Sequence, residues 1–270
     1  MKIKLELEYS PGTYSGWQSQ PGLLTIQGEL ENALAIFLKS QYKKAAREEP
    51  GETNSFVTIT GSGRTDAGVF AKGQAASFSW PSDVPIDTSR LKCALNALTS
   101  RELLVRNVEV MRDDYDARHS PHVKCYKYNL VLGTRGGGYY GKIAWCVGEQ
   151  VVDIPAMISA ARYLRGCRDY SSFRAKDCTA KSTVRTLLLS ELSRTGPNSL
   201  VYVVCGSGFL KQMIRIIVGT LVDVGKGKIT FEEFKNIVEA RDRRRAGQTA
   251  PACGLVLEWV RYADNYVPIG

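Results

Sequence analysis

The sequence predicts an α+β protein made of two related halves. Residues 2–9 alternate polar and apolar side chains, a pattern typical of a half-buried strand. Residues 25–38 instead repeat apolar side chains at helical spacing. Strand-like and helix-like segments then continue to alternate along the 270 residues, a length that suits one large or two ordinary domains.

The first half is predicted to contain two helices and a closing strand. The first helix begins at Thr25, and its apolar face consists of Ile26, Leu30, Leu34, Phe37 and Leu38. Asp87 is expected to cap the second helix, since a side-chain oxygen can accept a backbone N–H there. The apolar positions of that helix are Leu91, Leu95 and Leu98. A strand over residues 103–110 ends this half.

The second half is predicted to begin with a strand over residues 122–132. Asp153 and Pro155 then mark the start of a helix. The remaining predicted elements are paired strands over 182–192 and 199–205, a helix over 209–223, a helix that starts with a capping box at Thr230 to Glu233, and a closing strand over 254–262. Residues 133–141 are expected to form either a mobile hairpin or an ordinary surface loop.

A loop around Asp66 is the main candidate for chemistry. Residues 56–60 and 74–80 are rich in β-branched and aromatic side chains, so both are expected to be strands. Residues 64–71 should therefore connect two strands at the end of a sheet. A carboxylate in such a loop can face a substrate and still be rigidly aimed, which makes Asp66 a candidate nucleophile.

Other interpretations of this loop are available. The residues Gly61, Ser62 and Gly63 begin like a dinucleotide-binding loop, but no third glycine completes that motif and no Gly-Lys-Ser/Thr follows. A carboxylate at the centre would also repel a phosphate. A plainer alternative is that Asp66 only caps a turn, a common role for aspartate.

Composition favours a polyanionic partner. The chain has 36 basic and 27 acidic residues, a formal net charge of +9, with a hydrophobic fraction of 44%. Nucleic acid is favoured over an anionic membrane because no basic amphipathic helix stands out and no apolar run approaches transmembrane length.

Cysteine usage indicates a reducing compartment. The seven cysteines are scattered and contain no CxxC pair, and only His119 and His122 accompany them, so no metal is expected. His119 is expected to be a surface residue or a histidine satisfied within a strand, and the alternative is that it stacks on RNA. The strand-like N-terminus does not resemble a signal or transit peptide. An organellar protein whose leader had been removed would look the same, so the expected location is the cytoplasm or an organelle matrix.

Several blocks resemble, in order, the motifs of one enzyme family. GRTDAGVFA at 63–71 resembles the catalytic loop GRTDAGVHA of the tRNA pseudouridine synthase A (TruA) family, with Phe70 in place of histidine. YSGWQSQ at 14–20 and TIQGELE at 25–31 are similar to its opening motifs. The later matching blocks are DARHSPHVKCYKYNL at 116–130, DYSSFRA at 169–175, FLKQMIRIIVG at 209–219 and AGQTAPACGLVLEWVRY at 246–262.

This resemblance implies a pseudouridine synthase fold without a cofactor. Two related α+β domains, residues 1–112 and 113–270, would share a mainly antiparallel central sheet with helices packed on it. The active-site cleft would lie between the domains. The implied substrate is tRNA, modified in the anticodon stem-loop, and the implied assembly is a homodimer.

The resemblance also implies roles for individual residues. The catalytic residues would be Asp66 as the nucleophile, Tyr126 as the ring that stacks on the target uracil, and Arg215 as the partner of the Asp66 charge. Asp66 could attack ribose C1′, add to the uracil ring, or remove a ribose proton to form a glycal. The residues expected to bind substrate are Arg64, Thr65, Gly68, Gln74 and Arg174.

Two other functions remain possible. Phe70 and Ile216 depart from the family pattern beside proposed active residues, where histidine and asparagine are usual. A tRNA-binding and folding module that has lost the chemistry is therefore an alternative. A general basic RNA-binding protein is a weaker one, because the aromatic signature of an RNA-recognition motif is missing.

Overall fold

The computed structural model describes residues 1–44, 57–81, 84–133, 138–148 and 153–263. They form two compact units, which we call unit 1 (Met1–His122 and Glu258–Gly270) and unit 2 (Val123–Leu257). Each unit combines helices with strands, and the strands pair mainly antiparallel. The predicted α+β class is therefore confirmed. The domain boundary at residues 112 and 113 stays a prediction.

The sheet of unit 1 is built around its N-terminal strand. Its strands are β1 (Lys2–Tyr9), β2 (Thr60–Gly61), β3 (Phe70–Ser79) and β4 (Leu103–Met111). β1 pairs with both β3 and β4, and β2 pairs with β3. The alternation predicted for β1 is confirmed, because its apolar residues Ile3, Leu5, Leu7 and Tyr9 are all buried.

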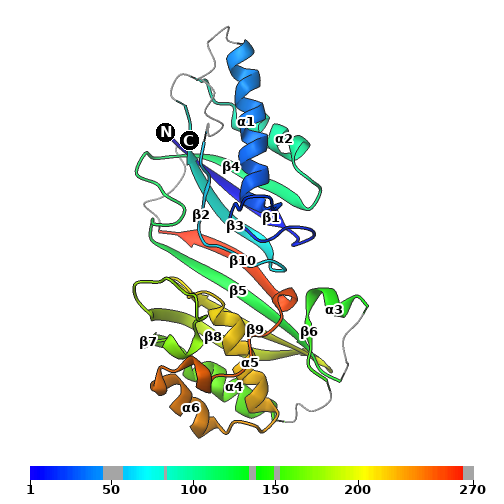
Figure 1. The fold of residues 1–270 in the computed structure, drawn as a ribbon, viewed down its shortest axis with the longest axis vertical. Coiled ribbons are helices and arrows are strands. Elements are labelled where there is room, and N and C mark those ends of the chain that lie inside the picture. Colours follow the sequence, from blue (N-terminus) through cyan, green and yellow to red (C-terminus); the bar gives the residue numbers. More distant parts are fainter. Residues whose placement is uncertain (45–56, 82–83, 134–137, 149–152, 264–270) are drawn as a thin grey trace. The chain divides into compact units, whose positions relative to one another are not determined.

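Two helices of unit 1, α1 (Ile26–Lys44) and α2 (Thr88–Leu98), lie side by side (Figure 1). The predicted apolar face of α1 is buried at every named position. Asp87 caps α2 as predicted, since its Oδ1 accepts the N–H of Arg90 at 2.9 Å. Leu98 differs from the prediction: it is the last residue of the helix and is 42% exposed.

The sheet of unit 2 has the order β5, β9, β8, β7, with β6 pairing parallel to β5. The bounds are β5 (His122–Val131), β6 (Trp145–Cys146), β7 (Gly166–Asp169), β8 (Val184–Gly196) and β9 (Ser199–Gly206). The predicted hairpin is confirmed, because β8 and β9 pair from Leu187 to Gly196 across a turn at Pro197 and Asn198. The last strand, β10 (Leu255–Tyr262), contributes residues to both units.

The longer helices of unit 2 are α4 (Ile154–Tyr163), α5 (Met213–Gly225) and α6 (Phe231–Ala240), which gather together (Figure 1). Short elements are α3 (Tyr140–Ile143), η1 (Ser171–Phe173), η2 (Arg243–Arg245) and η3 (Ala252–Gly254). The capping box predicted at Thr230 is present. The Asp153 cap of α4 is confirmed as well.

Three local predictions need correction or lie partly outside the described residues. The helix predicted to start at residue 209 starts at Met213, because Gln212 has a left-handed backbone with φ of 58°. In the strand predicted over 56–60, only Thr60 pairs among the described positions. Part of the loop at 133–141 lies outside the described residues. In the part of the chain that the structure describes, no helix is long and apolar enough to span a membrane.

Candidate functional site

Asp66 lies in the connection between β2 and β3, in a short turn of unit 1. The N–H of Val69 donates to the carbonyl of Asp66 at 3.2 Å, and Gly68 takes a φ of 83°, which favours glycine. The Asp66 side chain is half-buried, whereas that of Arg64 is exposed. The carboxylate is thus partly accessible on a turn whose backbone is constrained.

The segment that follows β1 packs directly against this turn. The N–H of Trp17 donates to the carbonyl of Thr65 at 3.1 Å. A Cβ added to Gly16 would lie 2.8 Å from the same carbonyl oxygen and 3.0 Å from the nitrogen of Ala67, and Gly16 also has a φ of 96°. Only glycine suits a position with both of these constraints. The YSGWQSQ block therefore supports the loop that carries Asp66.

A buried network of side chains holds the loop from the other side. The hydroxyl groups of Tyr9 and Thr65 lie 2.8 Å apart. The Gln74 amide donates to the carbonyl of Gly63 at 2.8 Å and to the Tyr9 hydroxyl at 3.4 Å, and it accepts the Ser62 hydroxyl at 2.6 Å. These side chains are buried in unit 1, so Thr65 and Gln74 support the loop from within.

A hollow beside Asp66 is too narrow to hold a water molecule. Its lining includes Tyr9, Tyr14, Thr65, Asp66 and Gly68. A nucleobase does not fit inside this space. A base that reaches Asp66 has to approach the carboxylate from outside the hollow.

Tyr126 lies on β5 in unit 2, opposite Val204 of β9. Its side chain is 7% exposed, and its ring packs edge to face against Phe209, with ring centroids 5.2 Å apart and planes at 81°. Such an arrangement is favourable for two aromatic rings. Phe209 was not named from the sequence as a site residue, although it begins the FLKQM block. It holds the orientation of the Tyr126 ring.

Arg215 lies in the first turn of α5, and its side chain is half-buried. Its Nε donates to the carbonyl of Ala250 at 2.8 Å, and the N–H of Ala250 donates back to the carbonyl of Arg215 at 3.0 Å. The Nε bond ties the guanidinium group to segment 247–251, part of the AGQTAPA block, and the backbone bond ties the same segment to α5. The directions in which the terminal nitrogens can point are thereby restricted.

Arg174 is exposed at the end of η1, close to the loop that precedes α5. The N–H of Ala175 donates to the carbonyl of Lys211 at 3.0 Å, and Lys211 pairs with Asp177 at 2.5 Å. The loop at 209–212 therefore contacts Tyr126 through Phe209 and the Arg174 segment through Lys211. Unit 2 groups Tyr126, Arg174 and Arg215 around one loop, and unit 1 groups the remaining candidate residues around Asp66.

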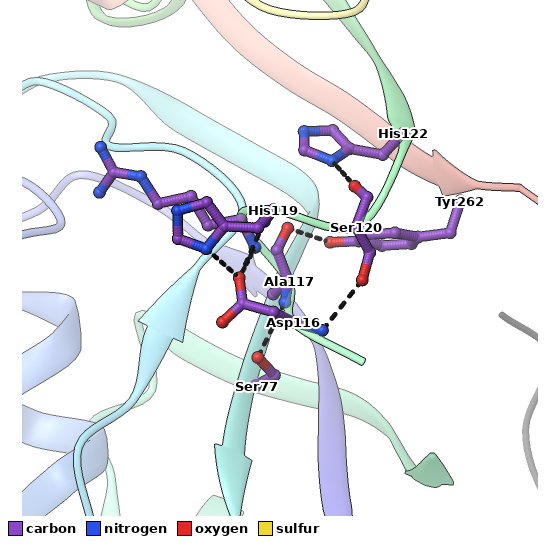
Figure 2. Close-up of polar contacts among 8 residues, drawn as sticks. Ser77, Asp116, Ala117, His119, Ser120, His122 and Tyr262 are labelled. Carbon is purple, nitrogen blue, oxygen red and sulfur yellow. Dashed lines mark hydrogen bonds and ion pairs between the residues drawn. The ribbon is translucent and has the colours of Figure 1, made fainter. Parts of the chain in front are cut away.

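His119 belongs to a separate polar cluster in unit 1, which Figure 2 shows. Its ring Nδ1 lies 2.9 Å from Asp116, which also accepts the N–H groups of Arg118 and His119 at 2.8 Å each. Burial would raise the pKa of Asp116, but these donors outweigh it and the net shift is downward. Tyr262 anchors the same segment by donating to the carbonyl of Ala117 at 2.7 Å. The His119 side chain is 78% exposed, as expected for a surface residue.

No metal centre is found within the described ranges, where no group of three or more histidine, cysteine or acidic side chains is placed to hold an ion. The candidate residues themselves supply a carboxylate, a phenol and guanidinium groups. These can attack a carbon, transfer a proton and stabilise negative charge.

Comparison with known proteins gives consistent matches. A family model described as tRNA pseudouridine synthase matches residues 160–263. A tRNA pseudouridine synthase A from Geobacter sulfurreducens is 39% identical over 260 residues, which cover 96% of this chain and 99% of that protein. The protein of the same name from Bacillus subtilis is 36% identical over 98% of this chain and 100% of its own length. One from Clostridium kluyveri is 36% identical over 96% of this chain and 99% of its own length.

Proposed function

Because the chain belongs to the tRNA pseudouridine synthase A family, we propose that it converts uridine to pseudouridine in tRNA. The reaction breaks the bond between ribose C1′ and N1 of uracil and joins C1′ to C5 of the same base. The proton on C5 is released, and N1 gains one. The isomerisation needs an anionic nucleophile or base and a pocket that keeps the detached uracil away from water.

The observation that carries this proposal is the position of Asp66. It is a half-buried carboxylate on a turn that is bonded to Trp17 on one side and to the Tyr9 and Gln74 network on the other. A carboxylate held in this way loses little freedom when it attacks a substrate. Attack at C1′, addition to the uracil ring and formation of a glycal are all compatible with this position.

The other two catalytic roles would belong to residues of unit 2. Tyr126 would stack on the target uracil, supported by its contact with Phe209. Its hydroxyl would position or accept the proton that leaves C5. Arg215 would stabilise the Asp66 carboxylate in its ionised form, with a guanidinium oriented by Ala250.

Substrate binding would use exposed groups of both units. Flipping the uracil out of its stack costs a few kcal/mol, and Arg64 would occupy the vacated space or hold the phosphate of the flipped nucleotide. Arg174 would contact the RNA backbone from unit 2, and Gly68 would let the substrate approach the loop closely. The part of Thr65 and Gln74 in substrate binding would be indirect and small, because both side chains are buried and would support the loop that presents Asp66.

The substitution Asp66→Asn tests the nucleophile. Asparagine keeps the size of the side chain but has no negative charge, so turnover should fall by orders of magnitude while tRNA binding survives. The assay is release of tritium from tRNA labelled at uridine C5, measured with enzyme in excess over tRNA. Asp87→Asn is the matched control, because asparagine also caps helices and Asp87 lies at the start of α2. Substantial turnover by Asp66→Asn would refute the assignment.

The alternative of a folding module without chemistry rests on Phe70 and Ile216. Ile216 is fully buried, and its N–H follows the normal helical pattern to the Gln212 carbonyl at 3.0 Å, so isoleucine here is part of the core. Phe70 is half-buried at the start of β3. If the wild-type chain binds tRNA to saturation but no tRNA releases tritium, the folding module is the better description.

Homodimer formation and modification of the anticodon stem-loop belong to the same proposal. Sedimentation equilibrium of the purified chain would give a mass of one or two chains, and a single-chain mass at micromolar concentration would refute the dimer. Mapping pseudouridine in tRNA from cells with and without the protein would identify the modified positions. The expected location, the cytoplasm or an organelle matrix, stays a prediction.

A further inference from the structure

We infer that Tyr9 is a positioning residue whose hydroxyl, oriented by Gln74, holds Thr65 in place and thereby aims the Asp66 carboxylate. The inference rests on the proposed function, because it assigns a role in catalysis by Asp66. It also explains why a buried polar network lies directly beneath this loop. Nothing in the family motif that contains Asp66 identifies Tyr9, which lies 56 residues away from Thr65 in the sequence.

The hydrogen-bond pattern shows which groups of the network donate and which accept. The Gln74 oxygen accepts the Ser62 hydroxyl, so its nitrogen faces the carbonyl of Gly63 and the oxygen of Tyr9. An amide nitrogen has two protons, one for each of these acceptors. The Tyr9 oxygen therefore accepts from Gln74, and its own proton is available for the Thr65 hydroxyl oxygen 2.8 Å away.

The protonation state of Tyr9 agrees with its role as the donor to Thr65. Burial raises the pKa of Tyr9 to about 12, although the hydrogen bonds with Thr65 and Gln74 act in the opposite direction. The phenol is accordingly protonated at neutral pH and remains a donor. A buried phenol is suited to a fixed hydrogen bond in this environment and does not act as a base.

Thr65 links this network to the nucleophile. Its side chain is held by Tyr9, and its carbonyl accepts the N–H of Trp17, so Thr65 is fixed at two points immediately before Asp66. On the other side of Asp66, the turn is closed by the N–H of Val69. Loss of the Tyr9 hydroxyl would free one of these points and let the direction of the Asp66 side chain vary. Small errors in the direction of a reacting group lower the rate strongly.

A double-mutant cycle of Tyr9→Phe and Thr65→Val tests the inference. Both substitutions remove a hydroxyl and nearly preserve shape. Each should lower the single-turnover rate on the order of tenfold and leave tRNA affinity within about twofold, because the network affects orientation and does not contact the substrate. The double variant should be no slower than the slower single variant, since both changes break the same hydrogen bond. Thr65→Ser keeps the hydroxyl and should retain most of the rate.

Tyr202→Phe is the matched control. The Tyr202 hydroxyl is also buried and lies 2.8 Å from a hydroxyl oxygen, that of Ser190, but this pair is in unit 2 between β9 and β8. Its loss should lower the melting temperature about as much as Tyr9→Phe does, and should leave the single-turnover rate unchanged. A purely structural role for Tyr9 would make the two variants behave alike at temperatures well below melting.

The outcomes separate this inference from the proposed function. If wild type and Asp87→Asn release tritium and Asp66→Asn does not, the proposed function holds. In that case, a wild-type rate for Tyr9→Phe would refute the positioning role and leave the proposed function intact. The same conclusion would follow if the double variant lost rate by the product of the two single losses. If the wild-type chain releases no tritium from any tRNA, the proposed function fails and the positioning role fails with it.

Discussion

At the scale of single residues, Arg215 is a charged side chain of the candidate site with a constrained geometry. Its Nε and its carbonyl form a reciprocal pair of hydrogen bonds with Ala250, a fully buried residue. A lysine at this position would keep the positive charge but could not form the Nε bond and present further donors in the same plane. The geometry of the charge, and not only its sign, is therefore specified here.

We predict that Arg215→Lys lowers the single-turnover rate by at least about tenfold while the chain stays folded. The measurement is tritium release with enzyme in excess, accompanied by a thermal unfolding curve. Arg106→Lys is the control, because Arg106 is an exposed arginine of unit 1 that pairs with Glu8. It should leave the rate unchanged. A wild-type rate for Arg215→Lys would show that a point charge is sufficient.

At the scale of elements, segment 247–251 is held between α5 and β5. The N–H of Gly247 donates to the Thr220 hydroxyl at 2.9 Å, and the Tyr128 hydroxyl donates to the carbonyl of Pro251 at 2.6 Å. Gly219 of α5 lets the segment approach, because an added Cβ would lie only 1.8 Å from the carbonyl oxygen of Gln248. The position of this segment in turn determines the Ala250 carbonyl that orients Arg215.

We predict that Gly219→Ala destabilises the chain by about 2 kcal/mol or more, because the methyl group has to displace backbone. Helix propensity alone would predict stabilisation of about 1 kcal/mol for this change. Gly28→Ala in α1 is the control, since its added Cβ would meet side-chain oxygens and no backbone, that of Thr25 at 3.0 Å and that of Ser19 at 3.7 Å. Urea unfolding measures both variants. Stabilisation by Gly219→Ala would mean that segment 247–251 is not held against α5.

At the scale of the whole molecule, buried phenols are a shared feature of both units. Among the described residues, seven tyrosines have raised pKa values, chiefly because burial disfavours the charged phenolate: Tyr9, Tyr14, Tyr115, Tyr128, Tyr170, Tyr202 and Tyr262. A tyrosine whose pKa in the folded state is above 10.0, its value in the unfolded chain, stabilises the folded state through this difference in pKa. That contribution to the free energy of unfolding is fully present at pH values below 10.0. It is lost as the pH rises from there towards the folded pKa.

We therefore predict that the free energy of unfolding falls steeply as the pH rises above about 10, with both units affected. Urea unfolding at a series of alkaline pH values measures the slope, and ultraviolet absorbance of tyrosinate shows whether the phenols ionise with unfolding. Tyr202→Phe should reduce the slope, because it removes one of the seven groups. A stability that does not change between about pH 10 and 12 would contradict the burial of these hydroxyl groups.

The sequence by itself determined the elements whose signals are local. Alternation identified β1, the apolar stripe identified α1, and local capping signals identified the starts of α2, α4 and α6. The motif resemblance also identified Asp66, Tyr126 and Arg215 as candidates, whose roles stay predictions. Such signals can be read because each depends on neighbours within one or two turns of the chain.

Only the tertiary structure decided which side chains support these candidates. Tyr9 and Gln74 are 65 residues apart, Tyr9 and Thr65 are 56 apart, and Arg215 and Ala250 are 35 apart. The start of α5 at Met213 likewise follows from the left-handed backbone of Gln212, in a loop whose Lys211 carbonyl accepts the N–H of Ala175. No periodicity or cap encodes these contacts, because a hydrogen bond between distant segments exists only after packing has brought its donor and acceptor together.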